Sequence, residues 1–469
     1  LAHLGYKQEF KRAFSRYELF GLAFSVNGVV QGIATVLVYS IPYGGPVSMV
    51  WGFLTGCVFI MCIALSIAEM GSSAPTAGAL YYWTFKYSPP SCRKYFAWLV
   101  GSAVAAMDYT CALTILTTVT LGTDGAYIAT SGHIYGTFCA VLVSHAVIAS
   151  LATKVIARIQ LLYAFLNVVI FVAFIIALPM ATPSEYKNTA KYALGHFENG
   201  GFDASIHTSE EALDAPSAVP FAILSSIGLV CVLGFGEGGC AFCVPCISHG
   251  DVPAVVICLA FNMGTALVAL LSSPIDQPMA VILANSLGTG GTITFWVFVA
   301  ILLYSAGMDI VIASSRQIFA FSRDGALPLS FVFYSINPYT GTPVNAVCLE
   351  RSHWGNFHYE RVLTPIIARF FGGQSFTPGP FSLGRASGPV AFVSTTFMIL
   401  MMVVFLFPAS PAPVAESMNY SVVVVGGVIT LATVYYLISG RFWFTGPVIT
   451  VADGSEGKQS DEKLSIGSA

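Results

Sequence analysis

The chain has 469 residues, of which 56% are hydrophobic and 9% are charged, and its formal net charge is -3. Soluble domains carry about 25% charged residues, so this composition excludes a soluble globular protein and indicates a polytopic membrane protein. The nearly balanced charge points to neither nucleic acid nor a strongly acidic partner. Most of the 11 cysteines lie singly inside apolar segments, where we expect small buried side chains rather than disulfides.

The chain begins with a basic segment, residues 1–18, which precedes the first apolar run. The positive-inside rule places this segment in the cytoplasm, and the apolar run behind it is too long for a secretory signal. The first span covers about residues 19–41. Its middle holds residues that suit a lipid-facing helix poorly: Asn27, Gly28, Gln31, Gly32 and Thr35. They predict a break in this span, with small residues packing against a neighbouring helix as the alternative.

A second apolar stretch starts near Gly45 and, at about 24 residues, is long enough to cross the hydrocarbon core. It ends in the sequence SIAEMGSSAPTAGALYYW. Glu69 in this sequence is expected to be a cytoplasmic helix-end residue. The aromatic cluster Tyr81, Tyr82 and Trp83 is expected to lie in the membrane interface.

The later spans follow from hydropathy, with basic residues expected on the cytoplasmic side throughout. The third span starts near residue 95 and contains Asp108, whose depth in the bilayer decides whether it is a functional candidate. Asn167 is expected to hydrogen-bond a neighbouring helix, and residues 272–291 are expected to form an outer loop. The other clear spans are expected at about residues 135–151, 161–179, 292–313, 390–407 and 422–438.

One polar motif follows the span at 292–313, with the sequence SRQIFAFSRDGALP. Its two arginines, Arg316 and Arg323, indicate the cytoplasmic side, and Asp309 is a possible partner for them. Together with the Ala-Glu helix end and the Pro-Thr-x-Gly turn described above, this motif resembles the amino acid, polyamine and organocation transporter superfamily. The closest resemblance is to its fungal amino acid and choline transporter branch, and it covers most of residues 4–447.

This resemblance implies an all-α membrane fold, normally of twelve helices in two inverted repeats of five plus two. About nine or ten spans are recognisable in this chain. We expect a cytoplasmic segment at 1–18, a transporter domain at 19–440 and a cytoplasmic tail at 441–469. The family pattern is interrupted near residues 101–108, 199–200, 236–254 and 349–363.

Residues 200–211, GGFDASIHTSEE, are unusually polar for this apolar chain. The paired glycines weaken a helix by roughly 1 kcal/mol each relative to alanine, and Asp203 would lie in a membrane only facing a cavity or a partner. A second helix break is therefore predicted here, and a loop followed by an amphipathic surface helix is the alternative. His207 is expected to be an interfacial, hydrogen-bonded residue rather than a proton relay.

Other segments depart from the family. About twenty apolar residues, the outer half of the sixth helix, are missing between Asn199 and Gly200. The run Cys240, Cys243, Cys246 and His249 is too dense for paired zinc knuckles, and a foreign insert such as a retained intron explains it better. The segment with His353, His358 and Glu360 holds no bilayer span and is read as a translated non-coding stretch, so no metal site is expected.

The resemblance implies substrate binding at two helix breaks, formed by Gly32, Ile33, Ala34 and Thr35 in the first and by Phe202, Asp203, Ala204 and Ser205 in the second. Backbone amides near Gly32 would receive a carboxylate. Phe202 would cover the ligand, and Asp203 would sense the amine or carry the coupled proton. Gln31 stands where the family has an apolar residue or proline.

The function predicted from these features is secondary active transport of a small amino acid, a GABA-like compound or a choline-like amine, coupled to protons. The alternative is a non-transporting or inactive relative of the same fold. An enzyme fits least, because no nucleophile, metal site or phosphate-binding pattern is present, and no cofactor is expected. The protein is expected in the plasma membrane, with the vacuolar membrane as the alternative, and with both termini in the cytoplasm.

Overall fold

The computed structural model describes residues 15–44, 46–102, 108–151, 153–193, 255–266, 270, 273, 275, 277–327, 329–340, 342–350, 358–404 and 421–448. Across these ranges, every regular element is helical. This confirms the expected all-α fold, because a chain that crosses a bilayer must satisfy its backbone polar groups within each segment.

The helices of the first half are α1 (Arg16–Asn27), α2 (Val29–Gly44), α3 (Pro46–Ser73), α4 (Ala79–Tyr87), α5 (Arg93–Ser102), α6 (Asp108–Gly122), α7 (Ser131–Leu151), α8 (Thr153–Ala181) and α9 (Ala190–Ala193). The later helices are α12 (Val255–Asn262), α14 (Pro278–Arg323), α15 (Ser330–Phe333), α16 (Val344–Glu350), α17 (His358–Phe371), α18 (Ser387–Val404), α19 (Ser421–Tyr435) and α20 (Arg441–Trp443).

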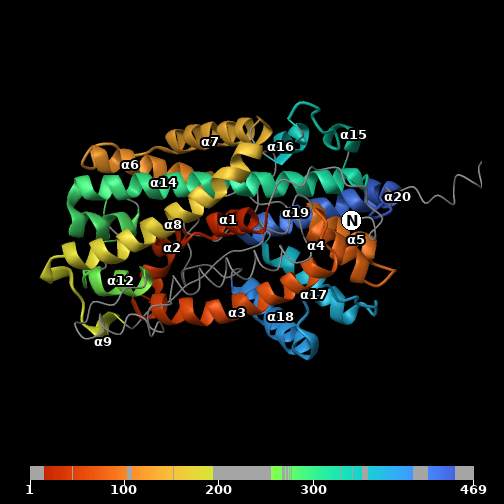
Figure 1. The fold of residues 1–469 in the computed structure, drawn as a ribbon, viewed down its shortest axis with the longest axis horizontal. Coiled ribbons are helices and arrows are strands. Elements are labelled where there is room, and N and C mark those ends of the chain that lie inside the picture. The colour runs from red at the N-terminus through yellow and green to blue at the C-terminus, as the bar shows by residue number, and fades with distance from the viewer. Residues whose placement is uncertain are drawn as a thin grey trace, which may run out of the picture.

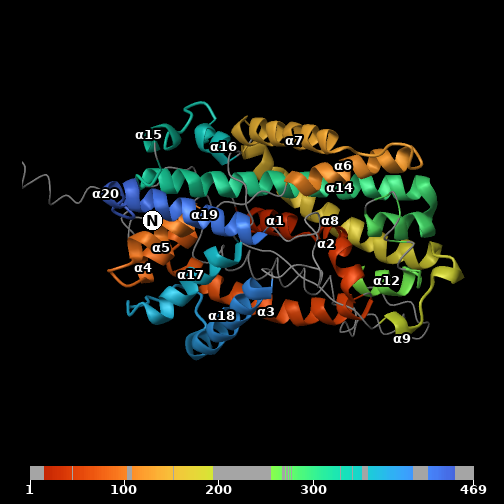
Figure 2. The same ribbon diagram turned by 180° about the vertical axis from the view of Figure 1, so that it is seen from behind.

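Helix α14 is the central element of the fold. Figures 1 and 2 show it running along the length of the molecule, where it packs against α1, α6, α7, α8 and α16. A kink interrupts it at Gly288, whose φ of 68° lies in the left-handed region that glycine adopts without strain. The stretch Pro278–Leu287 before this kink is helical, so the expectation of an outer loop over 272–291 was wrong for these residues.

The two largest apolar cores among the described residues both include parts of this central helix. The larger one joins α1, α2, α8, α12 and the first part of α14. The second joins α3, α4, α5, α17 and α18 with the end of α14. In both cores the buried side chains come from helices that are far apart in sequence, which is how a bundle of apolar helices fixes its arrangement.

Several expected spans are confirmed. Within the described ranges, five helical segments are long and apolar enough to cross a membrane: Gly56–Ser73, Ser131–Leu151, Arg158–Ala181, Pro278–Arg323 and Gly384–Val404. The first span is divided into α1 and α2, which have 12 and 16 residues. Neither half alone reaches the roughly 20 residues that a complete span requires.

The described parts of the third expected span are α5 and α6, which lie on either side of residues 103–107, a stretch outside the described ranges. Helix α5 packs on α4, α17 and α19, whereas α6 packs on α14 and α7. The two helices lie toward different ends of the molecule in both views (Figures 1 and 2). The side chain of Asp108, at the start of α6, lies outside the described part of the chain, so its functional role stays a prediction.

The aromatic cluster of α4 does not form the expected interfacial belt. Tyr81 and Trp83 are fully buried between helices, and only Tyr82 is partly exposed. The indole of Trp83 donates to the carbonyl of Ala74 at 2.8 Å. Tyrosine and tryptophan satisfy their polar atoms in this way when they are buried in a protein core.

Helix α17 belongs to the packed fold even though it begins inside the segment read as foreign. Val362, Leu363 and Ile366 are buried in the second core, against α4 and α18. Residues 351–357, which include His353, lie outside the described ranges. The reading of the segment as a translated non-coding stretch therefore stays a prediction, but its last residues contribute to the core.

Candidate functional site

The first span is broken, as the sequence predicted, but the break lies earlier than expected. Helix α1 ends at Asn27, helix α2 begins at Val29, and Gly28 between them has φ -5° and ψ 130°. The amide of Gly28 donates to Phe24 O at 2.9 Å, and the amide of Gly32 donates to Gly28 O at 3.1 Å. The first three residues of α2 thus precede the first intrahelical bond of that helix.

The predicted break residues Gly32, Ile33, Ala34 and Thr35 are therefore helical and lie in the first half of α2. The amides that face the break are those of Val29, Val30 and Gln31 instead. Hydropathy and glycine content mark both Gly28 and Gly32 as weak points, and they do not decide which one unwinds. Whether Gly32 to Thr35 contact a substrate stays a prediction.

Side chains cap the end of α1 at this break. The side-chain nitrogen Nδ2 of Asn27 donates to Ala23 O at 2.8 Å, and the side-chain nitrogen Nε2 of Gln31 donates to Ser25 O at 3.3 Å. Gln31 occupies the space beside Gly28 so closely that a Cβ on Gly28 would stand 1.4 Å from its Nε2. This explains why a polar residue, Gln31, stands where the family has an apolar residue or proline. Its side chain bonds a carbonyl that the end of α1 leaves without a partner.

A buried polar cluster lies beside the break, where α1 meets α8 and α14. Asp309 of α14 is fully buried and accepts a hydrogen bond from Gln160 Nε2 of α8, and the Ser25 hydroxyl of α1 lies nearby. Ser25 Oγ also lies 3.2 Å from Ser305 Oγ, one turn earlier on α14. Three helices thus converge on a single carboxylate.

Asp309 does not pair with the arginines of the motif that follows it. It forms no ion pair with any residue in the described part of the chain, so the expected pairing with Arg316 or Arg323 was wrong. Arg323 instead lies 3.7 Å from Asp324. The reason is helical geometry, because Arg316 lies two turns beyond Asp309 and belongs to a different layer of contacts.

Buried side-chain oxygens without a hydrogen-bond partner occur both at the break and at the Asp309–Gln160 pair. Four buried side-chain oxygens have no partner among the described residues: Asn27 Oδ1, Gln31 Oε1, Gln160 Oε1 and Asp309 Oδ2. An unsatisfied buried polar group costs about 1–3 kcal/mol. A site of this kind is suited to a group that brings donors, such as an ammonium group or a proton.

The second predicted break cannot be placed beside the first. Phe202, Asp203, Ala204 and Ser205 lie outside the described residues. The same holds for His207 and for the cysteine run ending at His249. Within the described ranges, no group of three or more His, Cys, Asp or Glu residues could hold a metal ion.

Asn167 was expected to bond a neighbouring helix, and the structure shows a bond within its own helix. Its amide nitrogen donates to Tyr163 O, one turn earlier in α8, at 3.0 Å. The expectation was wrong because a buried asparagine can bond the carbonyl four residues before it without any partner helix.

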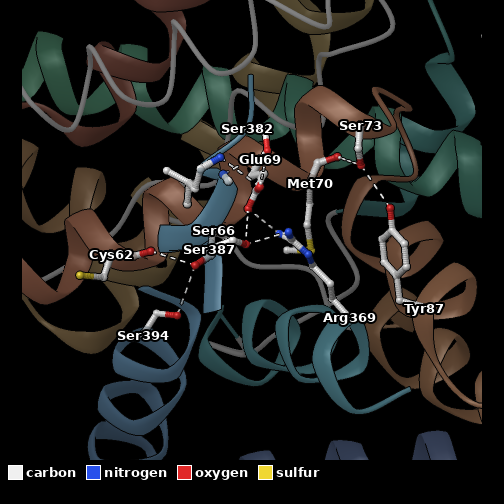
Figure 3. A network of polar contacts seen from close by, with 12 residues as sticks. Cys62, Ser66, Glu69, Met70, Ser73, Tyr87, Arg369, Ser382, Ser387 and Ser394 are labelled. Atoms are coloured by element: carbon white, nitrogen blue, oxygen red, sulfur yellow. Dashed lines mark hydrogen bonds and ion pairs between the residues drawn. The ribbon is translucent and has the colours of Figure 1, made fainter. Parts of the chain in front are cut away.

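A second polar network, which sequence reasoning missed, holds the end of α3 (Figure 3). Glu69 is buried and its Oε2 accepts from Arg369 Nη1 at 2.7 Å and from the Ser387 hydroxyl at 2.7 Å. Its Oε1 accepts from the Ser382 hydroxyl at 3.0 Å and from the amide of Leu383 at 3.1 Å. Both carboxylate oxygens are thus satisfied by residues about 300 positions later in the chain.

The guanidinium of Arg369 is held on three sides. Besides Glu69, its Nη2 donates to the Ser387 hydroxyl at 2.8 Å, and its Cζ lies 3.6 Å from the centre of the Phe376 ring. A charge-assisted bond and a cation-π contact together fix the position of the guanidinium group. The expected helix-end residue Glu69 is therefore a buried anchor, and the segment after α17 docks on it.

The polar motif at the end of α14 is also an anchor. Asp324 accepts a hydrogen bond from the Tyr81 hydroxyl of α4 and another from the amide of Val448 at 3.2 Å. Burial raises the pKa of nearby Tyr82 to about 12, with smaller contributions from Tyr87 and Asp324. The motif thus ties α14 to α4 and to the C-terminal segment.

The fold and the broken helix define the class of protein. A bundle of apolar helices in which one apolar span is interrupted, with a buried polar cluster at the interruption, is the arrangement of a secondary transporter. The amino acid permease family model matches residues 17–350, and the chain belongs to this family, within the fungal branch of the amino acid, polyamine and organocation superfamily. It is a transporter of amino acids and not an enzyme.

Similar proteins cover nearly the whole chain. The GABA-specific permease of Saccharomyces cerevisiae is 31% identical over 97% of this chain and 86% of its own length. An uncharacterized amino-acid permease of Schizosaccharomyces pombe is 32% identical, over 97% and 90%. The amino-acid permease BAT1 of Arabidopsis thaliana is 30% identical over 96% of each chain.

Proposed function

We propose that this chain imports a small amino acid, with GABA-like compounds as the preferred class and choline-like amines as a further possibility, and that a proton accompanies the substrate. The observation that carries this proposal is the break at Gly28 beside unpartnered acceptor oxygens. The amides at the start of α2 are donors for a carboxylate, and the acceptor oxygens suit an ammonium group. An amino acid carries both groups.

The similarity to a GABA-specific permease supports a substrate whose amine and carboxylate are separated. Asp203 and the residues around it, Phe202, Ala204 and Ser205, are proposed to complete the site from the second break. Asp203 would meet the amine or carry the proton. The proposed location is the plasma membrane with both termini in the cytoplasm, as the basic residues near the N-terminus favour.

The test is uptake of radiolabelled GABA, choline and a panel of amino acids by permease-deficient yeast that express the full chain. Wild-type chain is compared with Asp203→Asn at two external pH values. We expect uptake that rises at the more acidic pH and falls in the variant. Uptake that is the same at both external pH values and in both proteins would refute proton coupling through Asp203.

One observation favours a second reading, a relative that has lost transport. The alignment with the GABA-specific permease runs over 509 positions, more than the 469 residues of this chain, so that permease has residues that this chain lacks. The positions of the missing residues stay a prediction. Surface expression without uptake of any tested compound would support this second reading.

A further inference from the structure

Asp309 is a fully buried carboxyl group without a cationic partner in the described part of the chain. Its helix, α14, is one of the apolar segments long enough to span the membrane. A charged side chain that is buried in an apolar segment without a cationic partner is unfavourable. Protonation removes that cost, because it removes the charge.

The atoms around Asp309 are arranged to accept such a proton. Gln160 Nε2 donates to Asp309 Oδ1, while Asp309 Oδ2 and Gln160 Oε1 are both buried without a partner. A hydrogen on Oδ2 is a donor, and Gln160 Oε1 is the acceptor on the same amide group. One added proton would therefore satisfy two buried atoms and turn the carboxylate and the amide into a doubly hydrogen-bonded pair.

Among the described side chains of α1 and α8, the helices next to this carboxyl group, none is of a type that titrates near neutral pH. Tyr163 of α8 is within electrostatic range of Asp309, and it interacts in turn with Tyr304. Arg158 of α8 is exposed, and the charged residues Arg16 and Glu18 lie at the far end of α1. On α7, His145 lies against Tyr304, with ring centres 4.2 Å apart.

We propose that Asp309 binds the coupled proton, pairing with Gln160 as the neutral acid while α1, α8 and α14 are closed around it. The O–H bond on Oδ2 forms with a proton from water on one side of the membrane and breaks to return that proton to water on the other. This inference rests on the proposed function and deepens it, since it assigns the proton to Asp309 and leaves the amine to Asp203.

The connection to the helix break explains how the proton would affect transport. The Ser25 hydroxyl lies near the Asp309 carboxyl group and can turn its hydrogen toward the carboxylate, and the Ser25 carbonyl is capped by Gln31 from across the break. Hydrogen bonds to a charged group are roughly twice as strong as neutral ones. The ionised form thus holds the end of α1 against α14 more firmly than the acid form does.

Infrared spectroscopy of the purified full chain tests the protonation directly. We expect a carboxylic-acid C=O band at neutral pH that shifts in heavy water, persists in Asp203→Asn and disappears in Asp309→Asn. Asparagine is a close mimic of the acid form, because its NH₂ group can donate to Gln160 Oε1. An acid band that survives in Asp309→Asn, or wild-type chain without any such band, would overturn the proposal.

A second variant guards against a folding defect in Asp309→Asn. Ser25→Ala removes a hydroxyl that can donate to the carboxylate, which favours the acid form. The acid band of Ser25→Ala should therefore persist to a higher pH than that of the wild type. Disappearance of the band at the same or a lower pH would contradict the assignment of the band to Asp309.

Transport by the chain in liposomes tests the coupling. The probe is GABA, followed both as exchange of labelled for unlabelled GABA and as acidification of a trapped pH dye. In Asp309→Asn we expect the ratio of GABA-driven acidification to GABA exchange to fall to zero, whatever rate of exchange remains. Complete loss of exchange would assign Asp309 to the amine instead, and intact acidification would also refute the proposal. Wild-type chain that does not move GABA refutes the proposed substrate, while the infrared band still decides on Asp309.

Discussion

Arg369 Nη1 lies 2.7 Å from Glu69 Oε2, and both side chains are buried where the end of α3 meets α17 and α18. Three further groups donate hydrogen bonds to the Glu69 carboxylate: the hydroxyls of Ser382 and Ser387 and the amide of Leu383. The ion pair is thus embedded in a satisfied network. Removing one partner would strand the other in a medium that solvates charge poorly.

Arg369→Ala is expected to destabilise the protein by about 3–5 kcal/mol, the usual effect of breaking a buried ion pair by removing one partner. Thermal unfolding of the purified protein in detergent measures this effect. Arg441→Ala is the control, because Arg441 is exposed and contacts the Phe442 ring. Combining Arg369→Ala with Glu69→Gln should recover part of the loss, and equal losses in Arg369→Ala and Arg441→Ala would contradict the prediction.

The position of the break predicts different effects for two neighbouring glycines. A Cβ on Gly28 would displace the Gln31 side chain from its place beside the break, whereas a Cβ on Gly32 would meet only Asn27 O at 3.5 Å. Gly28→Ala should reduce amino acid uptake severalfold at unchanged surface expression. Gly32→Ala should be tolerated and should favour α2 by about 1 kcal/mol. The reverse order of effects would move the functional break to Gly32, as the sequence suggested.

The raised pKa of Tyr82 predicts that the folded protein loses stability at alkaline pH. Burial raises its pKa from 10.0 to about 12 in the folded protein. The folded state therefore holds its proton more tightly than the unfolded state, so this stabilisation is present below pH 10 and is lost as pH rises toward 12. Unfolding temperatures of wild type and Tyr82→Phe, measured from pH 9 to pH 12, should converge or cross as pH rises. A constant difference between the two across that range would show that Tyr82 does not contribute.

The segment between α17 and α18 approaches α3 so closely at Gly379 that no larger residue should fit there. A Cβ at this position would stand 2.2 Å from the backbone oxygen of Ser72, and backbone atoms cannot move aside cheaply. Ser72 also accepts a hydrogen bond at its Oγ from the amide of Phe381 at 2.9 Å. Gly379→Ala should therefore lower the unfolding temperature clearly. Gly388→Ala, where a Cβ meets nothing within 4 Å, is the control and should not lower it.

Hydropathy was sufficient to predict the long spans. Helices α7 and α8 and the apolar part of α3 lie where uninterrupted apolar runs of sufficient length placed them. The break in the first span was also predictable, because Asn27 and Gly28 interrupt an otherwise apolar run. Its position was four residues off, since the choice of Gly28 over Gly32 depends on the side chains that cap the end of α1.

The polar contacts were not predictable in this way. Glu69 and Arg369 are 300 residues apart, and nothing local to either one indicates the other. Asp309 was expected to pair with an arginine on its own helix and instead accepts a hydrogen bond from Gln160 of α8. Tyr81 and Trp83 have the composition of an interfacial belt, and only tertiary packing reveals that they are buried. Hydropathy reports burial from water and does not distinguish lipid from protein as the apolar surrounding.

The network at Glu69 also bears on how the chain can be divided. The family match ends at residue 350, while Arg369, Ser382, Leu383 and Ser387, which complete the Glu69 carboxylate, all follow it. A shortened chain that stopped at the family boundary would contain an acidic residue buried without its cation. We expect such a part to be stable only when the residues after 350 are expressed with it as a second chain, as in complementation between separately expressed halves of a membrane protein.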